Sequence, residues 1–237
     1  MNNVITLLDK YGDAVKGVRS KLGLSHHDSF EEIINMTMLM KHRIELIQHI
    51  FENIQNFKWE KLYNFNFMKD KEGKLAQEFS DITIVFHNEK LMGNYLVLFL
   101  TSLIALYTGL IDSLALLLKY SFLLEIERVS VDSVQKKIGI ASLQAKLKDM
   151  ILEDNDYRIL KSIRKELIHF NLSSVIVYSD IKSEPGPGTR YSGVPMIHQD
   201  LLKGVDVNQR RVPGYTSFIH KKITQILEDI LTATITL

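Results

Sequence analysis

Residues 95 to 111 read YLVLFLTSLIALYTGLI and contain no charged side chain. The apolar run continues past Asp112 as DSLALLLK, and its length is that of a membrane span. A helix surrounded by neighbours in a bundle is also apolar on nearly every side. Asp112 favours the bundle, because an acid near the centre of a span costs about 2.5–3.5 kcal/mol. We therefore expect a central bundle helix and no stable membrane insertion.

Helical patterns continue on both sides of this run. Between Asp28 and Phe57, apolar residues recur at three- and four-residue steps after a possible capping box formed by Ser29 and Glu32. A later helix can begin at Asp154 or Asn155, which are both good N-cap residues. Short strands are possible in SDITIVF (80–86) and SSVIVYSDI (173–181), because both are rich in β-branched residues. The sequence predicts a mainly α fold, a helical bundle with possible short β segments.

The chain is expected to form a single domain over residues 1–237. We divide it into an N-terminal helical extension, a core, a long loop and a C-terminal helix, over residues 1–89, 90–171, 172–214 and 215–237. The loop contains all four prolines and five of the twelve glycines. No regular element of length fits that composition. Loops this long are usually functional or disordered.

Composition limits the classes of function. A chain of 237 residues with 46% apolar content can bury one sizeable core. Its 29 Lys and Arg balance 28 Asp and Glu, so no overall field attracts nucleic acid or an anionic membrane. The absence of cysteine excludes disulfides and thiolate sites. The start lacks the pattern of a signal peptide, so we expect a cytoplasmic protein.

No pattern for a cofactor or a metal stands out. The glycines of GPGTRYSG (186–193) follow no strand and precede no helix, so they do not form a nucleotide fingerprint. His42 and His49 are seven residues apart, which separates them by about 10 Å along a helix and is too far for one metal ion. We predict neither a cofactor nor a metal.

One helical segment carries a spacing that suggests chemistry. In SIRKELIHFNLS (162–173), Arg164 and His169 are separated by four residues, and Lys165 directly follows the arginine. Aliphatic Leu167 and Ile168 precede the histidine. This pattern resembles the signature of the HEPN superfamily, in a form typical of uncharacterised bacterial members. The resemblance covers roughly residues 95–170.

The resemblance implies a fold, an activity and an assembly. HEPN domains are helical bundles, and many are metal-independent ribonucleases of toxin–antitoxin and defence systems that act as dimers with facing motifs. The family places its motif on a late helix, after a long apolar helix that often carries a polar residue of its own. Asp112 and Ser113 can fill that place. The resemblance thus implies a homodimer that acts on RNA, with an antitoxin or another protein as a possible partner.

The chemistry of such a site can be stated from the residues. His169, with an ordinary pKa near 6.5, can take the proton of a 2′-hydroxyl, and Arg164 can stabilise a phosphate as it gains charge. Lys165 can add a second cation. Five helical steps turn by about 500°, which leaves positions 164 and 169 about 140° apart. One helix would not aim both side chains at one phosphate, whereas two copies across a two-fold axis could.

A second interpretation needs no catalysis. Arg164 could pair with an acid such as Asp112, which we expect to be enclosed in the bundle, and His169 could cap the helix end. The chain would then be a non-catalytic module that binds a nucleotide, RNA or a partner protein. In either case, three arginines of the long loop are candidates for contact with RNA: Arg190, Arg210 and Arg211.

Overall fold

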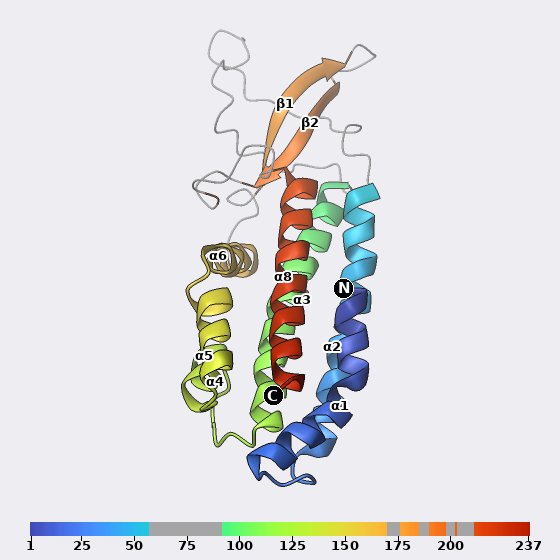
Figure 1. Cartoon of the computed structure of the whole chain (residues 1–237). Coiled ribbons are helices and arrows are strands. Elements are labelled where there is room, and N and C mark those ends of the chain that lie inside the picture. Colours follow the sequence, from blue (N-terminus) through green and yellow to red (C-terminus); the bar gives the residue numbers. More distant parts are fainter. Residues whose placement is uncertain (57–91, 170–175, 185–189, 198–201, 203–210) are drawn as a thin grey trace. The chain divides into compact units, whose positions relative to one another are not determined.

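The structure is a computed structural model, and it describes residues 1–56, 92–169, 176–184, 190–197, 202 and 211–237 (Figure 1). Most of these residues are helical. The helices are α1 (Asn2–Leu22), α2 (Phe30–Asn56), α3 (Met92–Ser121), α4 (Val131–Lys137), α5 (Ala141–Leu147), α6 (Asn155–His169) and α8 (Val212–Ile235). A π-helical turn, η2 (Lys148–Leu152), separates α5 from α6. The prediction of a mainly α helical bundle is confirmed, and α2 and α3 match the two long helices expected from the sequence.

The segment predicted as a long loop contains two strands instead. Strand β1 (Ile176–Glu184) pairs antiparallel with β2 (Arg190–Ile197), and a bulge interrupts the register between Ser179 and Lys182. The strand expected in SSVIVYSDI is therefore confirmed. The prediction of no regular element after it is wrong for residues 190–197. The strand expected in SDITIVF lies outside the described residues.

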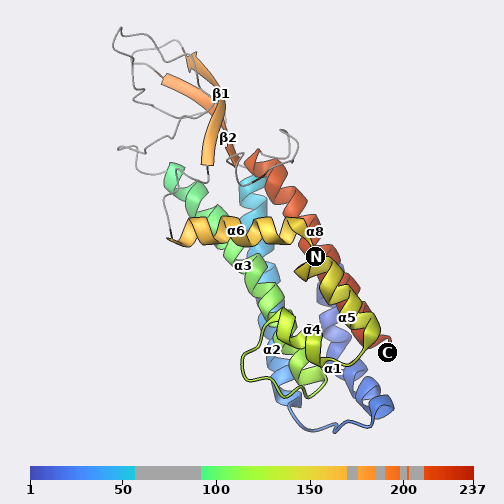
Figure 2. The same cartoon turned by 90° about the vertical axis from the view of Figure 1, so that its left-hand side faces the viewer.

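The chain divides into two compact units. Unit 1 comprises Met1–Ile50, Leu103–Lys161 and Ile219–Leu237, and unit 2 comprises Phe51–Ser102 and Ser162–Phe218. Unit 1 contains α1, α4 and α5 entirely, and unit 2 contains the hairpin. Each of the helices α2, α3, α6 and α8 contributes one part to each unit. Within unit 1, α1, α2, α3 and α8 run alongside one another (Figures 1 and 2).

The core of unit 1 is built from the apolar stripes of these four helices. Its fully buried side chains include Val4, Leu8, Ile44, Ile47, Leu110, Ile111, Leu117, Leu118, Ile226, Leu227, Ile230 and Leu231. Burying one such side chain contributes about 1.5–3 kcal/mol. Polar contacts fix the helices to one another: Lys41 pairs with Asp9, and the Tyr11 hydroxyl lies 3.0 Å from Ser121 Oγ. Since Ser121 donates to the Leu117 carbonyl, Tyr11 is the donor in that contact.

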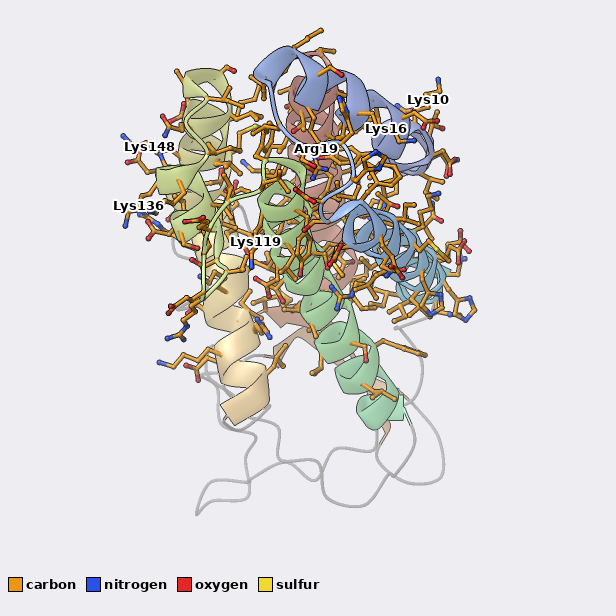
Figure 3. The ribbon with its side chains drawn as sticks, turned by 90° about the horizontal axis from the view of Figure 1, so that it is seen from below. Lys10, Lys16, Arg19, Lys119, Lys136 and Lys148 are labelled. Atoms are coloured by element: carbon orange, nitrogen blue, oxygen red, sulfur yellow. The ribbon has the colours of Figure 1, made fainter. Side chains whose placement is uncertain are left out.

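A buried arginine closes one end of unit 1 (Figure 3). Arg19 has no exposed surface, and its guanidinium donates only to backbone carbonyls. Nε and Nη2 donate to Ser121 and Tyr120 at 3.0 and 2.5 Å, and Nη1 donates to Ser25 and Asp28 at 3.1 and 2.7 Å. The cation therefore lies at the negative C-terminal end of α3 and links it to the segment between α1 and α2. Burial lowers the pKa of Arg19.

The apolar helix α3 fits both alternatives that the sequence left for it, a membrane span and the central helix of a bundle. Its segment Leu98–Ser121 has a mean hydropathy of 1.7 and is long and apolar enough to cross a membrane, while 61% of its apolar window is buried. A core helix of a bundle meets the same criteria. The absence of stable membrane insertion stays a prediction.

Candidate functional site

The helix that carries the motif, α6, has a firmly held start. Asp154 accepts a hydrogen bond from the backbone N of Tyr157 at 2.8 Å, and it also accepts one from Lys222 Nζ of α8 at 2.5 Å. Lys222 lies 3.5 Å from Asp156 as well. Burial lowers the pKa of Lys222, but the hydrogen bonds and charges of the two carboxylates outweigh it and raise that pKa. The prediction that this helix begins at Asp154 or Asn155 is confirmed.

Arg164 lies on α6, and one nitrogen of its guanidinium has no hydrogen-bond acceptor among the described residues. The side chain is half-buried, its Nε is enclosed, and no described residue accepts a hydrogen bond from that nitrogen. A buried donor left in this way costs about 1–3 kcal/mol. Such groups usually have a specific explanation, and one of these is a ligand that supplies the acceptor.

The two other motif residues differ from Arg164 in position. Lys165 is exposed, and His169 is the last residue of α6, with a side chain that lies outside the described part of the chain. A regular helix turns by about 100° per residue, so positions 165 and 169 lie about 40° apart. Position 164 lies about 140° from 169. On one helix, the cation that shares the face of His169 is therefore Lys165.

Asp112 does not take the place expected for it. It is exposed on α3, whereas its neighbours Ile111, Ser113 and Leu114 are buried. The expectation of an enclosed carboxylate is wrong, because Asp112 falls on the most accessible side of this helix, in line with half-buried Gly109. We withdraw Asp112 from the site.

Ser113 is buried and already engaged. Its Oγ accepts a hydrogen bond from Arg43 Nη1 of α2, and the same nitrogen donates to the Gly109 carbonyl at 2.6 Å. This contact joins α2 to α3 within unit 1, so Ser113 has a structural role there. Arg43 was missed in the sequence. Its signal was a charged residue one position before buried Ile44, on the inner side of an otherwise amphipathic helix.

The three arginines predicted to contact RNA have different outcomes. Arg190 is the first residue of β2, where it pairs in register with Glu184. Arg211 is exposed and forms an isolated bridge with Met196. Arg210 lies outside the described residues. A role in RNA binding stays a prediction for all three.

Another pair of titratable side chains lies in unit 1. Tyr107 of α3 and His220 of α8 are in hydrogen-bond contact, with the hydroxyl 2.8 Å from Nδ1. Burial raises the pKa of Tyr107, and burial together with the positive Met1 amino group lowers the pKa of His220 to about 4. This low pKa leaves the imidazole uncharged at neutral pH, and the contact joins α3 to α8 within unit 1. The sequence offered no signal for it.

No group of three His, Asp or Glu side chains that could hold a metal ion occurs in the described ranges. Comparison with known proteins gives no relative: neither a family model, nor a curated protein, nor a solved structure matches this chain.

Proposed function

We propose that this protein is a metal-independent RNA endonuclease of HEPN type that acts as a homodimer. The observation that carries the proposal is the enclosed Nε of Arg164, which has no acceptor among the described residues although it lies in the motif of Arg164 and His169. A phosphate oxygen is negatively charged and has free lone pairs, so it can accept the hydrogen bond that this nitrogen does not make within the protein. The helical bundle is consistent with the resemblance on which the motif was singled out.

The proposed reaction uses only a base and cations. His169 takes the proton of a 2′-hydroxyl, and the freed O2′ attacks the adjacent phosphorus. A new O2′–P bond forms as the P–O5′ bond breaks, and the departing 5′ oxygen takes a proton from water. Arg164 stabilises the negative charge on the phosphate in the transition state, with Lys165 as a second cation. The products are a 2′,3′-cyclic phosphate and a 5′-hydroxyl.

A dimer is part of this mechanism. Because positions 164 and 169 point about 140° apart on one helix, a single copy presents Arg164 and His169 to different sides. Two α6 helices facing each other across a two-fold axis can combine the arginine of one protomer with the histidine of its partner. Light scattering at micromolar concentration tests the assembly, and a strict monomer contradicts the composite site.

Activity is tested with purified protein, single-stranded RNA and EDTA. Cleavage should yield cyclic-phosphate ends, and His169→Ala should lower the rate by about 10²-fold or more. His49→Ala, which removes an exposed imidazole from α2, is a matched control that should leave the rate unchanged. Equal cleavage by wild type and His169→Ala would support the alternative, a non-catalytic binding module. Cleavage that requires magnesium and survives His169→Ala would point to a contaminant or to another site.

A further inference from the structure

The solvent face of α6 is lined with cations. Arg158, Lys161 and Lys165 are all exposed, and exposed Ser162 lies among them. Their three- and four-residue steps place the cations on one face of the helix. The next step of four residues leads from Lys165 to position 169, the histidine of the motif. We call Arg158, Lys161 and Lys165 the α6 basic face.

The charges of the α6 basic face are not neutralised by carboxylates of the described residues. Arg158 Nε donates to the Leu152 carbonyl at 3.1 Å, and Lys161 Nζ lies 5.9 Å from the centre of the Tyr157 ring. Neither contact involves an acid. No carboxylate of the described residues therefore offsets either charge.

The acidic residues nearest to these cations in the sequence either pair with Lys222 or lie on another side of the helix. Asp154 and Asp156, at the start of the helix, pair with Lys222. Glu166 is half-buried, and its position lies about 100° around the helix from Lys165. A net positive face is therefore left between Arg158 and the motif.

The shape of this face suits an extended polyanion. From Arg158 to His169 the helix rises by about 16 Å, which is long enough to follow several consecutive phosphates of one strand. A small anion would need donors that converge on one point. A row of separate cations on a convex helix instead suits repeated phosphates, which long flexible side chains contact without reading sequence.

We propose that the α6 basic face binds the sugar-phosphate backbone of single-stranded RNA and leads the strand to His169 and, across the dimer, to the Arg164 of the other protomer. This inference rests on the proposed function for its substrate class. It adds Arg158 and Lys161 as binding residues outside the motif, and it places the RNA path on a helix rather than on the arginines near the hairpin.

The test measures binding apart from cleavage. The full chain carrying His169→Ala is titrated into a fluorescein-labelled single-stranded RNA, and anisotropy is followed over a series of KCl concentrations. Lys161→Ala and Arg158→Ala should each reduce the slope of log K against log salt by about 0.7, and each should weaken binding by about fivefold near 0.1 M salt. Thermal melts confirm that the variants fold, and glutamine replaces alanine in any variant that does not.

Charge-matched controls come from exposed cations elsewhere in unit 1. Lys137→Ala and Arg128→Ala change the net charge equally and should leave the slope unchanged. Equal losses in controls and test variants would overturn the inference, because net charge alone would explain them. Wild-type cleavage with unchanged slopes would overturn it and leave the ribonuclease proposal standing. Slope losses without wild-type cleavage would support the α6 basic face and overturn the catalytic proposal.

Discussion

Two arginines, one in each unit, are held in opposite ways. Arg19 of unit 1 is fully buried, and its guanidinium donates to the four carbonyls of Ser25, Asp28, Tyr120 and Ser121. Arg164 of unit 2 is half-buried, and its enclosed Nε has no acceptor among the described residues. The whole Arg19 guanidinium and the Nε of Arg164 both lose contact with water, but among the described residues only Arg19 has hydrogen bonds that compensate for the loss.

The difference is the one expected between a structural cation and the ligand-binding cation that we propose. A buried cation whose three nitrogens all donate hydrogen bonds stabilises the fold, whereas an enclosed donor without an acceptor destabilises it and persists where function requires it. Arg19 closes one end of a helical core, and Arg164 is the group that we assign to a ligand phosphate. The comparison fails if the two side chains contribute equally to stability.

The largest expected effect is on the stability of the Arg19→Ala variant. The substitution leaves four carbonyls without their donor and a space in the core, so we expect a loss of about 3–4 kcal/mol in the free energy of unfolding. Arg19→Lys keeps the charge, but an ammonium group cannot bond to both the end of α3 and the segment between α1 and α2 as a planar guanidinium does. This variant should therefore be less stable than wild type and more stable than Arg19→Ala. Urea denaturation followed by circular dichroism measures both. A loss below about 1 kcal/mol for alanine would remove Arg19 from its structural role.

The matched substitution Arg164→Met should have little effect on stability and a large effect on the rate of RNA cleavage. Because it removes a donor without an acceptor and keeps the apolar stem, stability should change by less than about 1 kcal/mol. The rate of RNA cleavage should fall by about 10²-fold or more, since a charge-stabilising group is lost. Denaturation and single-turnover cleavage of one preparation give both values. Large instability with little change in rate would make Arg164 a second structural arginine.

The sequence predicted what depends on local pattern. Periodic apolar residues located α2, and Asp154 marked the start of α6, because caps and amphipathic stripes are written within a few residues. The apolar run in α3 predicted a core helix but not the side on which Asp112 lies. A helix with almost no polar residue has no periodicity to orient it.

Features that depend on distant partners were missed. Strand β2 contains Gly193 and Pro195, two residue types that are unfavourable within a strand. It forms because it pairs with β1, and that pairing cannot be read from the residues of β2 alone. The carbonyls around Arg19 come partly from residues about a hundred positions later in the chain. The motif around Arg164 was visible in the sequence, but its enclosed Nε was not.

A pH titration extends the comparison to His220, another polar group in the interior of unit 1. Its folded pKa of about 4 lies below the ordinary value of 6.5, so the unfolded chain binds more protons between these two values. Stability should be full above about pH 6.5 and should fall as the pH drops toward 4. Because His220 is partly exposed, solvent screening limits the loss to about 1–2 kcal/mol. Urea denaturation at several pH values measures it, and His220→Gln should remove this part of the pH dependence. An unchanged slope in that variant would assign the loss to other groups.

The smallest expected effect concerns Lys222, a cation held by carboxylates rather than carbonyls. The side chains of Lys222 and Asp154 are 30% and 12% exposed, while those of the surface pair Lys136 and Asp132 are 67% and 56% exposed. Lys222→Met should cost about 1 kcal/mol, because it leaves a largely buried carboxylate with only the Tyr157 amide, whereas Lys136→Met should cost less than about 0.5 kcal/mol. Urea denaturation at low and high salt compares the two variants, and salt should reduce only the smaller effect. If both losses are equal and vanish together in salt, then Lys222 acts as a surface charge, and α6 does not depend on it for the position of its first turn.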